Sequence, residues 1–172
     1  MNSITPISQA LLDRYEAVKK NFVGADVPWL AAIRDESAAT FRKHGLPTPR
    51  TEDWKYTNLR ALNKIAFDGD AATDVNVADL PERAGSGPRL VFVDGRYRGD
   101  LSHSGASTKG VRCSHVADLL ESDKDLIESS LADTGDETPL LALNGAFQED
   151  GYALILERTT LVDELVEVLH VN

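Results

Sequence analysis

The sequence predicts an α+β protein in which helices come first and short strands follow. Two observations carry this prediction. Apolar residues recur at helical spacing through residues 1–64, whereas from residue 89 onward they gather in short runs between turns that contain glycine, proline or aspartate. The chain has 172 residues and is 42% hydrophobic, so it can bury a core and global disorder is not expected.

Two helices are expected at the start of the chain. Thr5-Pro6 is a capping residue followed by proline at the first helical position, and Gly24 ends this element. Asp26-Val27-Pro28 repeats the start signal, and His44-Gly45 ends the second helix, because glycine readily adopts the backbone conformation that closes a helix. The expected aromatic core of this helical part comprises Trp29, Phe41 and Trp54.

Residues 46–60 combine two prolines with an aromatic pair. The prolines disfavour helix directly before them, and Thr51 is a good N-cap for a third helix with acidic residues in its first turn. Trp54 and Tyr56 flank Lys55, which leaves two interpretations. Either the aromatic side chains pack this turn onto the preceding helices, or the three residues form a cation–π or partner-docking patch.

The middle of the chain changes character. Residues 68–88 are small, acidic and rich in glycine, which is typical of a linker or, alternatively, of a long surface connection within one domain. We therefore predict a helical subdomain over residues 1–67, an acidic, glycine-rich linker over 68–88, and a mixed α/β segment over 89–172.

Strands are expected from residue 89. Leu90 to Val93 is a short apolar run, and Asp94-Gly95 is a strong hairpin turn after which residues 96–98 return antiparallel. Val111, Cys113 and His115 alternate, so they share one face of a strand. Further helices are predicted over 117–131 and 140–147, and further strands over 152–156 and 161–171.

Cys113 and His115 are the pair to consider for metal binding. They supply two ligands, whereas a structural zinc site normally needs four and an iron–sulfur cluster usually needs several thiolates. The chain has one cysteine, and its other histidines fall in different predicted elements. Phosphate-loop and Gly-x-Ser-x-Gly motifs are also missing from the sequence. We predict no metal site, no catalytic residue and no enzyme, and keep a metal-dependent enzyme centred on Cys113 and His115 as a third hypothesis.

Charge and composition exclude other classes. The net charge is −10. Residues 65–172 hold eight lysines and arginines and twenty-one carboxylates, whereas residues 1–64 hold ten lysines and arginines and seven carboxylates. Such a chain is not expected to bind the nucleic-acid backbone, which requires clustered cations. No apolar run reaches the roughly 20 residues of a membrane span. The first residues lack a secretory pattern and a single cysteine fits a reducing compartment, so we expect a cytoplasmic protein.

Two motifs give a resemblance to a known family. Gly45 to Leu59 reads GLPTPRTEDWKYTNL and resembles a signature near the N-terminus of the SufD members of the SufB/SufD family, which belongs to the SUF system of iron–sulfur cluster assembly. Leu143-Asn144-Gly145-Ala146-Phe147, followed by Asp150-Gly151, is similar to the segment that precedes the β-helix core of these proteins.

The resemblance implies that the last strands enter a right-handed parallel β-helix, and that the chain is only the N-terminal portion of a longer protein, from a gene fragment or an artificial truncation. It also implies a non-catalytic scaffold component that pairs with a SufB-like subunit and a SufC-like ATPase in a SufBCD complex. The complex, and not this portion, would handle Fe–S clusters. The cysteine and histidine implicated in cluster work lie outside the matched portion, so no such role passes to Cys113 or His115.

Two further expectations concern partners. An open sheet edge at the end of the chain would permit self-association. The alternative function is an independent protein-binding module that uses the patch formed by Trp54, Lys55 and Tyr56.

Overall fold

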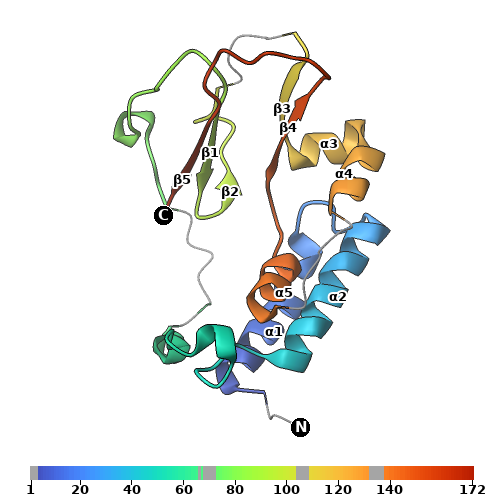
Figure 1. Ribbon diagram of the computed structural model, residues 1–172, viewed down its shortest axis with the longest axis vertical. Coiled ribbons are helices and arrows are strands. Elements are labelled where there is room, and N and C mark those ends of the chain that lie inside the picture. The colour runs from blue at the N-terminus through green and yellow to red at the C-terminus, as the bar shows by residue number, and fades with distance from the viewer. Residues whose placement is uncertain (1–3, 66, 68–72, 104–108, 132–137) are drawn as a thin grey trace. The chain divides into compact units, whose positions relative to one another are not determined.

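The computed structural model describes residues 4–65, 67, 73–103, 109–131 and 138–172 (Figure 1). The chain divides into two compact units, each built from two separate stretches of sequence. Unit 1 comprises Met1–Asp70 and Asp125–Gln148, and unit 2 comprises Ala71–Lys124 and Glu149–Asn172. The boundaries predicted along the chain after residues 67 and 88 stay a prediction.

Unit 1 is helical. Its first two helices begin where the sequence predicts and the second also ends there, but the first ends at Val18 and not at the predicted Gly24. Helix α1 spans Pro6–Val18, and the Thr5 side chain accepts a hydrogen bond from the Ser8 backbone N–H at 3.3 Å. Helix α2 spans Pro28–His44 and ends at Gly45, whose φ of 66° lies in the left-handed region. Further helices include α4, Lys124–Leu131, and α5, Pro139–Ala146, and a short 3₁₀ helix η1, Lys19–Asn21, directly follows α1.

The core of unit 1 lies between α1, α2 and α5. Tyr15 and Phe41 are almost completely buried, and the Tyr15 ring meets the ring of Phe147 edge-on with centroids 5.8 Å apart. Phe41 is therefore a core residue, as predicted. The same prediction is wrong for Trp29 and Trp54, because both are half-buried and lie outside this cluster. The aromatic partners come instead from distant sequence positions, which helical spacing alone does not reveal.

The predicted third α-helix does not form, because this segment adopts a different type of helix. The segment forms two 3₁₀ helices, η2 at Glu52–Trp54 and η3 at Leu59–Lys64. Thr51 makes no side-chain cap, because its Oγ1 accepts from the Thr48 backbone N–H at 3.3 Å. The following backbone bonds reach back three residues, as from Trp54 N–H to the Thr51 carbonyl at 2.9 Å, so the turn does not develop into an α-helix.

Unit 2 contains a three-stranded sheet of order β2-β1-β5. Strand β1, Arg89–Val93, pairs antiparallel with β2, Arg96–Tyr97, and parallel with β5, Glu167–Val171. Asp94 and Gly95 have φ of 50° and 80°, which confirms the predicted hairpin turn. The strand expected over 161–171 is shorter than predicted, since its first six residues are not in a strand.

A second, two-stranded sheet completes unit 2. Strands β3, Val111–His115, and β4, Tyr152–Leu156, pair antiparallel, with Cys113 opposite Leu154. The helix predicted over 117–131 is divided into α3, Val116–Ser122, and α4, because Asp123 leaves helical geometry with φ −143° and ψ 51°. The Asp123 carboxylate forms an ion pair with Arg112 of β3.

One face of the three-stranded sheet carries a small apolar core. Val75 is buried with Val91 and Val93, and Leu80 packs against them. A 3₁₀ helix, η4 at Val77–Asp79, lies in this covering segment, which sequence analysis assigned to a linker. At the start of β1, the buried Arg89 guanidinium pairs with Glu167 of β5 at 3.1 Å.

A parallel β-helix stays a prediction, since the described residues show a single parallel pair, β1 with β5. Among the described helices, none is both long and apolar enough to cross a membrane.

Candidate functional site

The turn that carries the Trp-Lys-Tyr sequence is fixed at both ends to the core of unit 1. At its start, Leu46 is buried and its backbone N–H donates to the Ser8 hydroxyl at 3.0 Å. At its end, Leu62 packs against the core cluster. Between them the chain follows a series of tight turns, including Thr57 N–H to the Trp54 carbonyl at 3.0 Å. This loop is therefore held in one shape by its own hydrogen bonds and by two apolar anchors.

The structure separates the three predicted partner-binding residues by exposure. Tyr56 is 93% exposed, Lys55 is exposed, and Trp54 is half-buried. The Lys55 ammonium lies 5.5 Å from the centroid of the Tyr56 ring, close enough for a cation–π contact. The interpretation in which both aromatic residues pack the turn onto the helices is wrong for Tyr56, because its ring faces solvent.

Cations gather along the same turn. Arg50, Arg60 and Lys64 are exposed, as is Lys55. Among the described residues, the ion pairs that are found leave these four side chains without a carboxylate partner. We call Arg50, Lys55, Tyr56, Arg60 and Lys64 the Tyr56 patch.

Cys113 and His115 share one face of β3, as predicted, but they do different things. Cys113 is half-buried, and burial raises the pKa of its thiol, which disfavours the thiolate that binds metals. The His115 ring contacts the Asp150 carboxylate and stacks on the Tyr97 ring with centroids 4.4 Å apart. His115 is therefore engaged by Asp150 and Tyr97 rather than by the thiol two residues away.

Asp150 is the residue that sequence analysis missed. Its carboxylate accepts the Tyr97 backbone N–H at 2.7 Å and the Gly151 N–H at 2.8 Å, besides contacting His115. The side chains of His115 and Asp150 are only 14% and 8% exposed. The Asp-Gly sequence predicts a turn, but Asp150 and Gly151 lie in irregular backbone before β4, and no local signal shows that the carboxylate connects β2 to β3.

No group of three or more histidine, cysteine, aspartate or glutamate side chains suited to hold a metal ion occurs in the described part of the chain. His115 and Asp150 offer one imidazole and one carboxylate, and these two groups already contact each other. It is better suited to hold two sheets together than to bind an ion.

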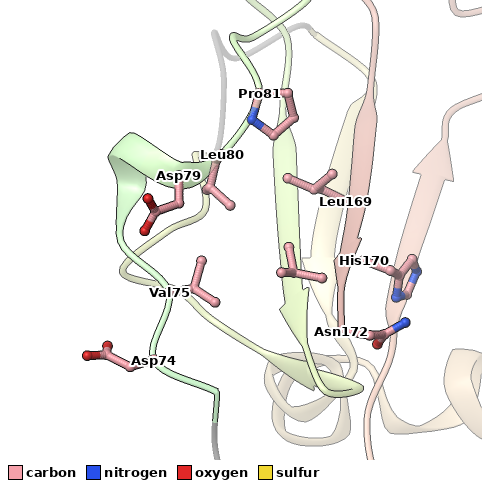
Figure 2. Close-up of a pocket in the computed structure, with 9 residues that line it drawn as sticks. Asp74, Val75, Asp79, Leu80, Pro81, Leu169, His170 and Asn172 are labelled. Atoms are coloured by element: carbon pink, nitrogen blue, oxygen red, sulfur yellow. The ribbon is translucent and has the colours of Figure 1, made fainter.

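A groove of about 510 Å³ lies beside β5, between that strand and the segment around η4. In Figure 2, Val75, Leu80 and Leu169 point toward one another, whereas Asp74 and His170 point away from them. Asp79 accepts a hydrogen bond from the Asn76 N–H at 3.2 Å. The interior of the groove is thus apolar, and its charged groups lie at the rim, so it lacks the convergent polar groups that fix a ligand's orientation.

Comparison with known proteins places the chain. The family model described as the SufBD protein N-terminal region matches residues 5–168. The chain belongs to the SufBD family. It is also 28% identical over 130 residues to the iron-sulfur cluster assembly SufBD family protein slr0076 of Synechocystis sp. (strain ATCC 27184 / PCC 6803 / Kazusa). That alignment covers 72% of this chain and 28% of the relative, so the chain spans well under half of the relative's length.

Both motifs that resemble SufBD proteins contribute residues to the packing of unit 1. Phe147 lies in the aromatic core of unit 1, with its centroid 6.3 Å from that of Phe22. A Cβ on Gly145 would lie 2.6 Å from the Ser37 hydroxyl of α2, so α5 approaches α2 closely only because this residue is glycine. Asp150 then begins the contacts of unit 2. In this SufBD chain the second motif therefore has a structural explanation, whereas the first motif also presents the exposed Tyr56.

Proposed function

We propose that this chain is the N-terminal part of a SufD-like scaffold component in the SUF iron–sulfur cluster assembly complex, and that it is not catalytic by itself. The observation that supports this is the family match over residues 5–168. The relative from Synechocystis is named as an iron–sulfur cluster assembly protein, which supports the same process for this chain.

The finer elements of this proposal follow from the resemblance. The partners are a SufB-like subunit and a SufC-like ATPase, and the compartment is the cytoplasm. Strands β4 and β5 lead into a parallel β-helix, to which the parallel β1–β5 register from Arg89↔Glu167 to Val93↔Val171 is well suited. No cofactor is proposed for this part; Fe–S clusters are the cargo of the whole complex.

Co-purification with a tagged SufB-like subunit and SufC-like ATPase tests the proposal. A chain extended into the solenoid part of the family should recover both partners, whereas residues 1–172 should lose most of that binding. The resemblance implies that the ATPase docks on C-terminal helices of the full-length protein, so retained ATPase binding by residues 1–172 would contradict this part of the proposal. Failure of the extended chain to recover the SufB-like subunit would contradict the scaffold role itself.

The second candidate is an independent protein-binding module that uses Trp54, Lys55 and Tyr56. One observation favours it: the Tyr56 side chain is 93% exposed on a loop that is otherwise well anchored. The two candidates are compatible, because a scaffold component needs surfaces for partners.

A further inference from the structure

We infer that the Tyr56 patch docks the acidic surface of a partner protein, with the Tyr56 ring and the neighbouring Lys55 as the central contact and the exposed cations of the same turn, Arg50, Arg60 and Lys64, as the source of its charge. This rests on the proposed role in a protein assembly and names the chemistry of one partner surface. Three features of unit 1 carry it, namely the exposure of Tyr56, the charge around it, and the rigidity of the loop.

The Tyr56 ring is a large surface that the described part of unit 1 leaves uncovered. A tyrosine ring is a large, mostly apolar surface, and tyrosine and arginine are enriched where proteins bind each other. Lys55 lies over the ring at 5.5 Å, and beyond the turn Ile65 and Phe67 are 49% and 42% exposed. Exposed apolar side chains therefore occur in the same stretch as the four cations of the Tyr56 patch, although others lie elsewhere, for example at Leu154 and Leu161.

The charge of this stretch indicates the sign of the partner. Arg50, Lys55, Arg60 and Lys64 outnumber the two carboxylates between them, Glu52 and Asp53. The rest of the chain from residue 65 has the opposite sign, with twenty-one carboxylates against eight cations. A complementary partner surface is therefore acidic, and charge complementarity of this kind speeds association and selects among partners.

The geometry of the loop limits the entropic cost of binding. Leu46 and Leu62 anchor its ends, and Asn58 caps η3 by accepting the Arg60 N–H at 3.0 Å. A patch held in this way does not have to be ordered when a partner arrives, which preserves affinity.

An acidic protein surface explains the patch better than nucleic acid does. Four cations interrupted by two carboxylates would release few counterions from a phosphate backbone, and the chain as a whole carries −10. An aromatic ring with a limited positive border suits a protein surface that offers carboxylates around an apolar contact.

The test is a fluorescence anisotropy titration of the intact 172-residue chain. The probe is a short fluorescein-labelled peptide of glutamates with two phenylalanines, compared with single-stranded DNA of equal charge. We expect the peptide to bind with an affinity that falls as salt is added. Tyr56→Ala and Lys55→Glu should each weaken binding by about fivefold or more. The matched control is Lys20→Glu, an exposed cation outside the patch, which should weaken binding less than about twofold.

Since Tyr56 is exposed, Tyr56→Ala should unfold at the same urea concentration as the wild type, so that lost binding does not reflect lost structure. The inference is overturned if the wild type does not bind the peptide, if Lys20→Glu weakens binding as much as Lys55→Glu, or if DNA binds as tightly as the peptide. Any of these results together with normal recovery of the SufB-like subunit by the extended chain would reject the acidic partner surface alone and leave the scaffold role standing.

Discussion

The Asp150 carboxylate gathers hydrogen-bond donors from three places in unit 2. The Tyr97 N–H comes from β2, the His115 ring from β3, and the Gly151 N–H from the residue that follows Asp150. Removing the carboxylate would leave a nearly buried imidazole and a backbone N–H without their acceptor, and buried polar groups that lose a partner are costly.

Asp150→Ala should lower the free energy of unfolding by about 2–4 kcal/mol. Asp150→Asn keeps one acceptor oxygen and should cost less. Urea unfolding followed by far-UV circular dichroism measures both. The control is Asp163→Ala, which deletes an exposed carboxylate in the same unit. It should change the free energy of unfolding by less than about 0.5 kcal/mol. Equal effects of Asp150→Ala and Asp163→Ala would show that Asp150 is not a structural joint.

Individual residues were predicted from the sequence with uneven success. Cys113 and His115 lie on one strand face, as period-two alternation predicts, because that relation is local. The roles of Asp150 and Tyr56 depend on what lies opposite them in space. An Asp-Gly pair indicates a turn whether or not its carboxylate also binds a distant histidine, and an aromatic residue in a turn gives no sign of which way its ring faces.

At the scale of elements, α5 approaches α2 closely in unit 1. Gly145 of α5 sits over Ser37 of α2, and the space for a Cβ is occupied by the serine hydroxyl. This contact explains why a glycine, which weakens helices, stands inside α5. The aromatic and alanine side chains that follow then reach the core, where Ala146 is almost completely buried.

Gly145→Ala should destabilise the chain by about 1–3 kcal/mol, although alanine is the better helix former. The reason is the 2.6 Å separation between the new Cβ and the Ser37 Oγ. A double-mutant cycle with Ser37→Gly provides the control, because opening the facing position should make Gly145→Ala neutral or stabilising. Urea denaturation of the four proteins gives the coupling energy. Additive effects within about 0.5 kcal/mol would contradict the close contact.

Most element types and ends were predictable where local chemistry decides them. As expected, helices begin at Pro6 and Pro28, α2 ends at Gly45, and Asp94-Gly95 forms the hairpin turn. The segment after Thr51 is predicted as an α-helix because its acidic first turn fits one, yet the Thr51 hydroxyl accepts a hydrogen bond from the Thr48 N–H instead of capping a helix. The parallel pairing of β1 with β5 joins strands that are distant in sequence, and no local pattern reports a partner at that separation.

At the scale of the whole chain, neither compact unit is one continuous stretch of sequence. The stretch Asp125–Gln148 belongs to unit 1, and the chain then returns to unit 2. Residues from α5, and Phe147 directly after it, complete the core of the first helices: Ala142 and Ala146 are buried there, and Leu140, Leu143 and Phe147 pack against it. The N-terminal helices are amphipathic, and such short helices need this packing to persist.

Residues 1–70 alone should therefore fail to fold stably, whereas the same residues joined through a flexible Gly/Ser linker to residues 125–148 should fold. Without α5, the rings of Tyr15 and Phe22 lose Phe147, their aromatic partner in the core. Far-UV circular dichroism and urea unfolding compare the two proteins, and we expect a cooperative transition only for the fused one. The matched control carries Ala146→Asp in the fusion, which places a charge at a position that is 1% exposed and should abolish that transition. A cooperative transition of residues 1–70 at the same urea concentration as the fusion would show instead that the N-terminal helices form an independent domain, with the boundary near residue 67 that the sequence predicts.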